Sequence, residues 1–453
     1  MTRGPSFGRH MRDTHFTFSP TFTPLNHGSY GATPRTVQEK HLSIQNLVAE
    51  RPDVFIVYQL PDLIDESRQA LAPLLGVPVD EVVLVPNATT GLNTVLRNLK
   101  FEDGDVVVHF STIYDSAEKT IASIGEMSPL VPARIPLEYP IEDAEIVRKF
   151  REMVAKLKAE AKNVKIALFD TISTFPGARM PWEDLVAACK ELEVLSLVDG
   201  AHGIGHIDLT HLGKVGPDFF VSNCHKFVFK ILPLFAYTEN SRWLYVPRGC
   251  AVFHVPARNQ HLIRTSLPTS HAYLYPSEKP DPHAKSQFAK LFEFVATIDY
   301  TPYPCVPAAI KFREDLGGEE IIRNYCWEVA RIGGNRVAEI LGTDVMDNRT
   351  STLSKCCFAN VRLPLDFKLE GKAQPQGYFS IDDAGKIQKW LNITAVNEFD
   401  TYLQIGFHSG RMWVRLSGQI YLAFKDFEWI GFRLKDLCDR LNKNPKLLRS
   451  AEV

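Results

Sequence analysis

The chain has 453 residues, of which 45% are hydrophobic and 23% are charged, enough for two or three packed domains. Its 51 basic and 53 acidic residues leave a formal charge of −2, which argues against binding to nucleic acid or an anionic membrane surface. Residues 1–20 lack the apolar core of a signal peptide, and no uncharged run approaches the roughly 18 residues of a membrane span. We therefore expect a soluble, cytoplasmic protein without nucleic-acid or membrane partners.

The eight cysteines show no CxxC spacing, and half of them lie within hydrophobic runs. This pattern predicts free, mostly buried thiols in a reducing compartment rather than a disulfide framework or a metal site. The cysteines are Cys189, Cys224, Cys250, Cys305, Cys326, Cys356, Cys357 and Cys438.

Short apolar runs alternate with amphipathic segments between about Asp80 and Pro256. Several runs are apolar on both faces, as strands buried in a mostly parallel sheet are. Residues 182–192 instead space their apolar side chains at helical intervals, with Pro181 and two acids at the start. The pattern predicts a large α/β domain whose strands are EVVLVP, DVVVHF, VKIALF, VLSLV, DFFVS and CAVFHV.

After Pro304 the pattern changes to a helix over 319–342, a strand over 356–364 and a terminal strand-and-helix segment over 411–441. These elements predict a smaller α+β C-terminal domain. We expect an N-terminal arm over 1–45 that packs with the small domain, a large domain over 46–300 and a small domain over 301–453. A flexible loop is expected over 368–377.

Polar clusters follow three of the predicted strands, where ligands collect in an open α/β sheet. Asn87 to Gly91 opens a helix whose amides suit a phosphate, although a capped helix start needs the same residues. Asp199 and Lys226 each follow a buried strand, and taken alone they could form a structural ion pair. Together the three clusters predict pyridoxal 5′-phosphate, with Lys226 forming the Schiff base and Asp199 keeping the pyridine nitrogen protonated.

Longer stretches make the sequence resemble the class V aminotransferase-like family of pyridoxal phosphate enzymes. They include NHGSYG, NATTGLNTVLRN, DGAHGIG, SNCHK, PRGCAVF and WVRLSGQIYL. Within the family the chain most closely resembles the hercynylcysteine sulfoxide lyases of ergothioneine biosynthesis, with the loline-pathway enzyme of secondary metabolism as a cousin. The resemblance spans about Phe18 to Leu441 and implies the fold-type I architecture, a large domain with a mostly parallel sheet flanked by helices.

The resemblance also implies site roles. Lys226 would be the Schiff-base lysine, Asp199 the pyridinium partner, and Tyr114 the ring stacked on the cofactor and a proton donor in the lyases. Contacts to the phosphate would come from Ala88, Thr89, Asn223 and His225, and contacts to the phenolic oxygen from Thr174 and His202.

The resemblance places the substrate carboxylate on Arg415, because a guanidinium pairs with a carboxylate through two parallel hydrogen bonds. Asn26 and His27 would line the substrate entrance, although both could simply cap the turn at Gly28. Thr297 would reach the phosphate of a neighbouring subunit, which implies a homodimer with shared active sites.

Four chemistries compete on this scaffold. A cysteine desulfurase needs a nucleophilic cysteine on a loop between His254 and Pro304, and the sequence has none there. A transaminase fits the fold but not the resemblance. A carbon–sulfur lyase that gives ergothioneine, pyruvate and ammonia from hercynylcysteine sulfoxide fits best, with loline-type carbon–carbon bond formation or decarboxylation as the alternative.

One segment departs from the family pattern. Residues 227–242 form an insertion directly after Lys226, and the pattern resumes at Trp243. The insertion is either an intron read as coding sequence or a genuine hairpin or lid, and it raises a further alternative, a catalytically impaired protein. Lys230 lacks the context of Lys226 and is not expected to carry the chemistry. Arg68 is expected on a helix surface.

Overall fold

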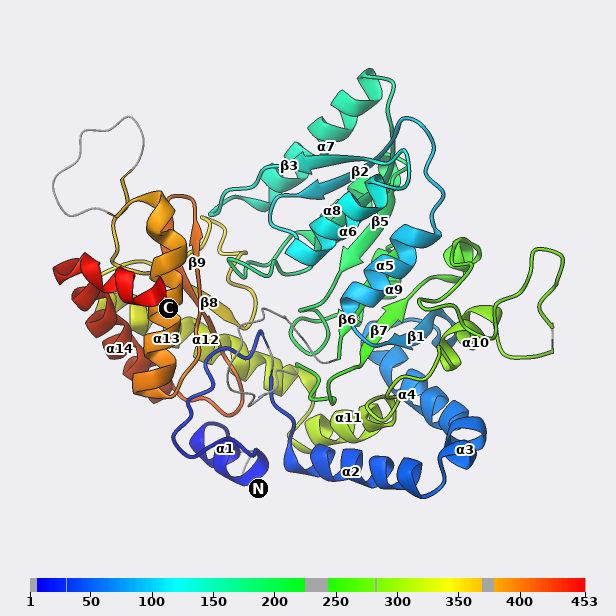
Figure 1. Cartoon of the computed structure of the whole chain (residues 1–453), viewed down its shortest axis with the longest axis horizontal. Coiled ribbons are helices and arrows are strands. Elements are labelled where there is room, and N and C mark those ends of the chain that lie inside the picture. The colour runs from blue at the N-terminus through cyan, green and yellow to red at the C-terminus, as the bar shows by residue number, and fades with distance from the viewer. Residues whose placement is uncertain (1–5, 30, 225–242, 282, 369–378, 453) are drawn as a thin grey trace.

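The computed structural model describes residues 6–29, 31–224, 243–281, 283–368 and 379–452. Figure 1 shows a large sheet with helices on both of its faces and, beside it, a smaller sheet packed against long helices. Among the described residues, none of the helices combines the length and the apolarity needed to cross a bilayer. The α/β class predicted from the sequence is confirmed.

The large sheet has seven strands. β7 is antiparallel to both of its neighbours, β1 and β6, and the remaining pairs are parallel. Their spatial order is β1 (Val82–Val85), β7 (Ala251–His254), β6 (Phe219–Asn223), β5 (Leu195–Asp199), β4 (Asn163–Asp170), β2 (Asp105–Phe110) and β3 (Val131–Ile135).

The six apolar runs singled out in the sequence are six of these strands. β3 was not predicted, because it is the edge strand and most of its side chains are not buried. An edge strand that carries a proline and an arginine lacks the continuous apolar character of its buried neighbours.

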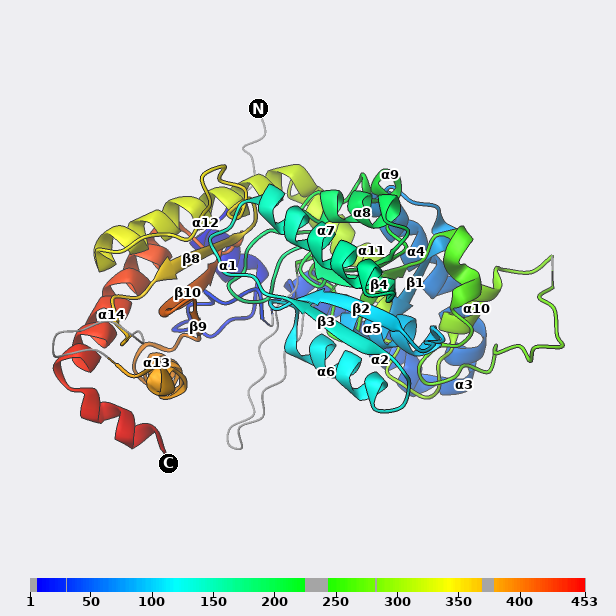
Figure 2. The ribbon, with the colours of Figure 1, turned by 90° about the horizontal axis from the view of Figure 1, so that it is seen from above.

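Helices cover both faces of the large sheet. Figure 2 shows α7 and α8 on one face and α5 and α6 on the other. The helical elements of this part of the chain are α2 (Arg35–Glu50), α3 (Pro52–Val54), η1 (Phe55–Gln59), α4 (Leu60–Leu75), η2 (Val79–Glu81), α5 (Ala88–Asn98), α6 (Asp115–Gly125), α7 (Asp143–Ala159), α8 (Trp182–Glu191), α9 (Leu212–Val215), η3 (Ala257–Leu262), α10 (Gln287–Glu293), η4 (Tyr303–Cys305) and α11 (Val306–Asp315).

The smaller unit is built on a three-stranded antiparallel sheet of order β8-β10-β9. Its strands are β8 (Phe358–Arg362), β9 (Gln404–His408) and β10 (Arg411–Ser417). Its helical elements are α12 (Glu319–Leu341), η5 (Ile381–Asp383), α13 (Ala384–Phe399), α14 (Phe424–Lys443) and η6 (Pro445–Glu452). The sequence predicted β8, β10, α12 and α14 but not β9 or α13.

The N-terminal segment, with α1 (Arg9–His15), packs on the smaller unit. Gly8 N donates to Ile420 O at 2.7 Å, and Arg12 forms an ion pair of 2.8 Å with Asp426. Ser417 N donates to Leu25 O at 2.9 Å, which ties the residues just before Asn26 to the end of β10. The predicted domain limits themselves stay a prediction.

Some expected features lie outside the described residues. They are His225, Lys226, the insertion over 227–242 and nearly all of the loop expected over 368–377.

The expectation for Arg68 was wrong. Its side chain is only 4% exposed and holds the chain that enters β1: Nε donates to Val82 O at 2.7 Å and Nη2 to Val79 O at 3.0 Å. Nη1 bonds Asp65 Oδ1 at 2.6 Å. An isolated arginine among apolar helix residues looks exposed in sequence, because the carbonyls that it satisfies belong to the next element.

Arg68→Met should destabilise the protein, because methionine fills the space but leaves the carbonyls of Val79 and Val82 without their donor and removes one of the two cations that pair with Asp65. We expect a loss of about 2–4 kcal/mol, measured as a lowered urea midpoint. The matched control is Arg148→Met on α7, where the arginine is exposed and pairs only with surface glutamates. An equal decrease in the urea midpoint for the two variants would contradict this stabilising role of Arg68.

Candidate active site

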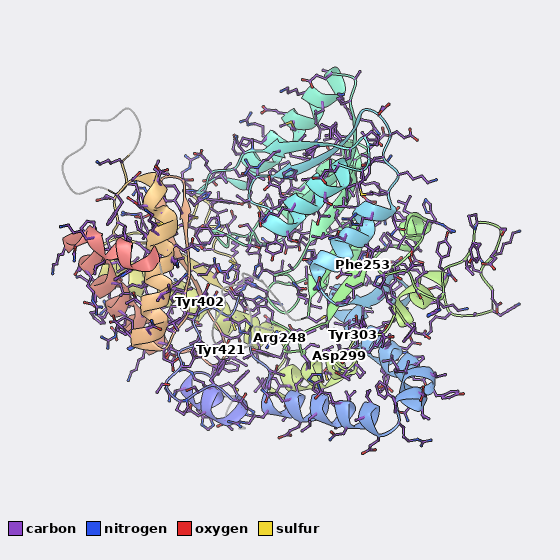
Figure 3. The ribbon with its side chains drawn as sticks, in the orientation of Figure 1. Arg248, Phe253, Asp299, Tyr303, Tyr402 and Tyr421 are labelled. Atoms are coloured by element: carbon purple, nitrogen blue, oxygen red, sulfur yellow. The ribbon has the colours of Figure 1, made fainter. Side chains whose placement is uncertain are left out.

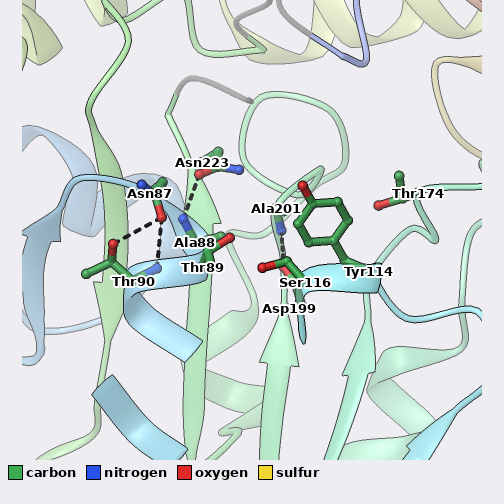
Figure 4. A pocket seen from close by; sticks show the side chains of 10 residues that line it. All are labelled: Asn87, Ala88, Thr89, Thr90, Tyr114, Ser116, Thr174, Asp199, Ala201 and Asn223. Atoms are coloured by element: carbon green, nitrogen blue, oxygen red, sulfur yellow. Dashed lines mark hydrogen bonds between the residues drawn. The ribbon is translucent and has the colours of Figure 1, made fainter. Parts of the chain in front are cut away.

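A cavity of about 340 Å³ lies where β5 and β6 end and α5 begins. Parallel strands bring their carboxyl ends to one edge of the sheet, so residues distant in the sequence meet there. Figure 4 shows the lining residues, which are Asn87, Ala88, Thr89, Thr90, Tyr114, Ser116, Thr174, Asp199, Ala201 and Asn223.

The first turn of α5 presents amide groups to this cavity. Asn87 caps the helix, since its Oδ1 accepts from Thr90 N at 2.8 Å. Ala88 N donates to Asn223 Oδ1 at 2.8 Å, which joins the start of α5 to the end of β6. The N–H and hydroxyl of Thr89 have no hydrogen-bond partner within the described residues and remain for a ligand. The positive end of the helix favours an anion at this point.

Asp199 and His202 occupy the turn after β5. Asp199 is 4% exposed, and its Oδ1 accepts from Ala201 N at 2.9 Å. Gly200 allows this tight turn, because a Cβ there would come within 2.4 Å of the Phe220 ring. His202 is 1% exposed, and neither of its ring nitrogens has a hydrogen-bond partner among the described residues. A buried imidazole in this state suits a polar ligand group.

Tyr114 stands at the start of α6. Figure 4 shows its ring between the turn that carries Asp199 and Thr174. Burial raises the pKa of the Tyr114 phenol, and the negative charges of Asp199 and Asp115 raise it further. The phenol is therefore neutral at physiological pH and can donate a proton.

Arg415 reaches the edge of the cavity from β10 and is 1% exposed. Its Nη1 donates to Thr174 O, and its Nη2 lies 3.2 Å from both Asn26 Oδ1 and Ser29 Oγ. The guanidinium stacks on Phe358 at 4.4 Å from the ring centroid. Gly177 makes room for it, because a Cβ at that residue would come within 2.5 Å of Arg415 Cδ.

No described residue balances the charge of Arg415 locally. Within the described part of the chain all its hydrogen-bond partners are neutral, and Nε has none. Burial lowers the pKa of Arg415 to about 9, and no carboxylate of the described residues offsets the effect. The group stays protonated at neutral pH, so an anion that entered here would recover part of the desolvation cost.

The other predicted site residues lie further away. Asn26 contacts Arg415, whereas His27 is buried against Tyr421 and Gln419, with its ring 4.5 Å from that of Trp243. Thr297 lies on an exposed loop after α10 and does not line the cavity. Its role toward a neighbouring subunit stays a prediction.

The residues present fit pyridoxal phosphate. The start of α5 offers donors to the phosphate, Asp199 supplies a buried carboxylate, and the Tyr114 ring offers a flat apolar face. His202 is not among the residues that line the cavity, and its two ring nitrogens have no hydrogen-bond partner among the described residues.

Sequence reasoning missed some residues around the site. Ser116 and Ala201 line the cavity, Ser29 bonds Arg415, and Phe358 stacks on it. Ser116 and Ala201 lie within two residues of predicted ones, so proximity could have found them. Phe358 follows Cys357 on a strand read only as core, and nothing in the sequence pairs it with Arg415.

Comparisons with known proteins agree with this site. Residues 56–229 match the family described as Aminotransferase class-V. The L-cysteine desulfhydrase-like protein lolT1 of Epichloe uncinata is 34% identical, over 96% of this chain and 96% of its own. The hercynylcysteine sulfoxide lyase of Schizosaccharomyces pombe is 27% identical, over 97% of this chain and 100% of its own.

The fold also matches a solved structure. The complex of the cystine C–S lyase C-DES with cysteine persulfide gives a TM-score of 0.68 at 17% identity, over 92% of this chain and 98% of that one. The similarity confirms the large and small units as the fold-type I arrangement expected from the sequence.

Thr89→Val should weaken binding of pyridoxal phosphate to cofactor-free protein about tenfold, because it removes one hydroxyl donor to a charged phosphate and keeps the shape. Titration calorimetry with pyridoxal, which lacks the phosphate, serves as the control and should show equal affinity for both proteins. An equal loss for both ligands would place Thr89 away from the phosphate.

Proposed function

This chain belongs to the class V aminotransferase family of pyridoxal phosphate enzymes, and on that premise we propose that it is a carbon–sulfur lyase for a cysteine-type amino acid. The finer proposal is hercynylcysteine sulfoxide as the substrate. The names of two relatives support the reaction class, since one is an L-cysteine desulfhydrase-like protein and the other a hercynylcysteine sulfoxide lyase.

The observation that carries the proposal is the buried, uncompensated charge of Arg415 at the edge of the cavity. A substrate α-carboxylate supplies the missing anion and fits the planar guanidinium. Thr174 connects Arg415 with the cavity, because Thr174 lines the cavity and its carbonyl accepts a hydrogen bond from Arg415. An amino acid held by its carboxylate therefore has its reacting carbons in the part of the cavity that Tyr114 lines.

The cysteines argue against a desulfurase. All eight lie within the described residues, where they are buried and form no disulfide. Burial raises the pKa of several of these thiols, among them Cys189, Cys250 and Cys438. A desulfurase needs an accessible thiolate to take the sulfur, so the sulfur of the substrate is expected to leave as a small molecule.

Each side chain of the site has a separate role in the proposed reaction. The cofactor, when bound, acts as an electron sink that makes the substrate α-proton acidic. Arg415 fixes the carboxylate, and Asp199 supplies the negative charge that the pyridine nitrogen needs. Tyr114, a neutral phenol whose pKa burial raises further, donates its proton to the leaving group as the bond from sulfur to the β-carbon breaks: to sulfur for a thiol and to the sulfoxide oxygen for a sulfoxide. Lys226, outside the described residues, is our proposed base for the α-proton.

Product analysis tests the proposal. Holoenzyme given hercynylcysteine sulfoxide and a thiol reductant should release pyruvate and ammonia in equal amounts, and L-cysteine should give pyruvate, ammonia and sulfide. Consumption of amino acid without pyruvate would instead favour the loline-type alternative. Deletion of residues 227–242 belongs in the same assay, because a large gain in turnover would favour the impaired-enzyme alternative for the full chain.

Tyr114→Phe should lower kcat for L-cysteine about 100-fold, the usual contribution of a general acid. β-Chloro-L-alanine is the control substrate, because chloride leaves without a proton. Its turnover should fall much less. An equal fall for both substrates would assign Tyr114 to stacking alone.

We also propose a homodimer with shared sites, supported by the exposed position of Thr297 away from its own chain's cavity. Sedimentation velocity should give twice the 51.1 kDa mass of the chain. A fully active monomer at the assay concentration would exclude shared sites.

A further inference from the structure

Phe358 and Arg415 are neighbours on one face of the small sheet. β8 and β10 are antiparallel, and Arg415 lies directly opposite Asn360. Because residues two apart on a strand point to the same face, Phe358 lies diagonal to Arg415 on that face. An aromatic ring and a long side chain can meet across such a diagonal, and the guanidinium carbon lies 4.4 Å from the ring centroid.

Two glycine backbones pack directly against the stack of Phe358 on Arg415. Gly28 N donates to Ser417 Oγ at 3.0 Å, which holds Gly28 against the same sheet. A Cβ on Gly28 would come within 2.4 Å of the Phe358 ring, and a Cβ on Gly177 within 2.5 Å of Arg415 Cδ. The close approach of both backbones leaves the stack little room to tilt.

Three further rings pack on Phe358 at steep angles. The ring planes of His202, His206 and Trp243 make angles of 85°, 86° and 70° with that of Phe358, at centroid distances of 5.2, 4.9 and 5.6 Å. Phe358 is itself only 2% exposed. Its ring is therefore held in place before any ligand binds.

The hydrogen bonds of Arg415 and the ring of Phe358 constrain different motions. Nη1 donates to Thr174 O, and Nη2 donates to Asn26 Oδ1 and Ser29 Oγ, so these bonds fix where the edges of the guanidinium lie. A ring stacked on its face restrains the tilt of the whole plane. That tilt matters because a carboxylate accepts two parallel hydrogen bonds only when it lies in the plane of the guanidinium.

The Phe358 ring also offers negative potential to the buried charge. Figure 3 labels Tyr402, whose phenol interacts with Arg415 in the small unit. Burial raises the pKa of Tyr402, and the charge of Arg415 offsets only part of that rise, so the phenol stays neutral at physiological pH. The face of an aromatic ring attracts a cation most strongly where both are desolvated, as Phe358 and Arg415 are.

We propose that Phe358 is a positioning residue, whose ring holds the Arg415 guanidinium in one plane so that the substrate carboxylate binds in one orientation. The inference rests on the proposed function, which assigns the carboxylate to Arg415. Phe358 is not among the residues that line the cavity and acts through Arg415. A fixed plane also makes the site selective, because it suits a planar carboxylate better than a tetrahedral anion.

The preference for a carboxylate measures this role. L-Alanine, which has no group to eliminate, and ethylamine, which lacks the carboxylate, are titrated into holoenzyme, and binding is followed by absorbance. In Phe358→Leu the preference for L-alanine should fall about tenfold, whereas the affinity for ethylamine should stay unchanged. A merely structural role would weaken the binding of both ligands.

The matched control is Phe427→Leu on α14. Phe427 is also fully buried in the small unit with its ring against a glycine, since a Cβ on Gly333 would come within 2.2 Å of it. The preference of this control for L-alanine should equal that of wild type. An unchanged preference in Phe358→Leu, or an equal fall in the control, would overturn the inference.

Shape selectivity gives a second test. L-Alanine and (R)-1-aminoethylphosphonate differ in their acid group, which is planar in the first and tetrahedral, with at least as much negative charge, in the second. Wild-type holoenzyme should bind L-alanine at least about fivefold more tightly, and in Phe358→Leu the two affinities should come within about twofold. Equal or tighter phosphonate binding by wild type, or a preference of wild-type size in Phe358→Leu, would overturn the inference.

The wild-type titrations separate this inference from the proposed function. Wild type that bound L-alanine no more tightly than ethylamine would contradict the carboxylate site of Arg415, and the proposed function and the inference would fail together. A wild-type preference for L-alanine that survives in Phe358→Leu would overturn only the role of Phe358.

Discussion

The buried guanidinium of Arg415 is the point at which three parts of the molecule meet. Asn26 and Ser29 come from the N-terminal segment, Thr174 from the large unit, and Phe358 from the neighbouring strand of the small sheet. All of these partners are neutral, so the folded chain keeps a cation in a low-dielectric site without a counter-ion among its described residues. Such an arrangement is costly unless a ligand supplies the anion.

The other polar groups of the site have to be considered together with the buried charge of Arg415. In the proposed function the cation binds one end of an amino acid and the start of α5 offers donors to a phosphate, with a neutral phenol and a buried carboxylate also at the cavity. Each group has its charge state set by its surroundings: burial and two carboxylates keep Tyr114 protonated, and burial weakens but does not remove the charge of Arg415. In the proposed elimination, one residue, Arg415, therefore binds the anion, and another, Tyr114, donates the proton.

The sequence predicted those parts of the fold and site that depend on local signals. Buried parallel strands are continuous apolar runs, so six of the seven strands were recognised, and Asp199 and Asn223 were placed at their ends. β3 was not recognised, because an edge strand lacks a continuous apolar run. Arg68 was judged from its own helix, although its partners lie in the next element. A small recess lined by Phe18, Phe22, Tyr402 and Tyr421 joins segments so far apart that no spacing rule links them.

The role of Arg415 had a different origin, since only resemblance to a family suggested it. The structure adds the physical reason, namely neutral partners and complete burial. The role of His225 still rests on that resemblance, and the role of Lys226 on the resemblance and the polar clusters of the sequence, because both lie outside the described residues.

The central claim is that Arg415 binds the substrate carboxylate, and a double-mutant cycle between protein and ligand measures it most directly. L-Cysteine and cysteamine, which lacks the carboxylate, are titrated into wild-type and Arg415→Met holoenzyme, and binding is followed by absorbance. The account predicts that wild type prefers L-cysteine by about 100-fold and that the variant prefers it by less than about threefold. A preference of the same size in both proteins would contradict the account.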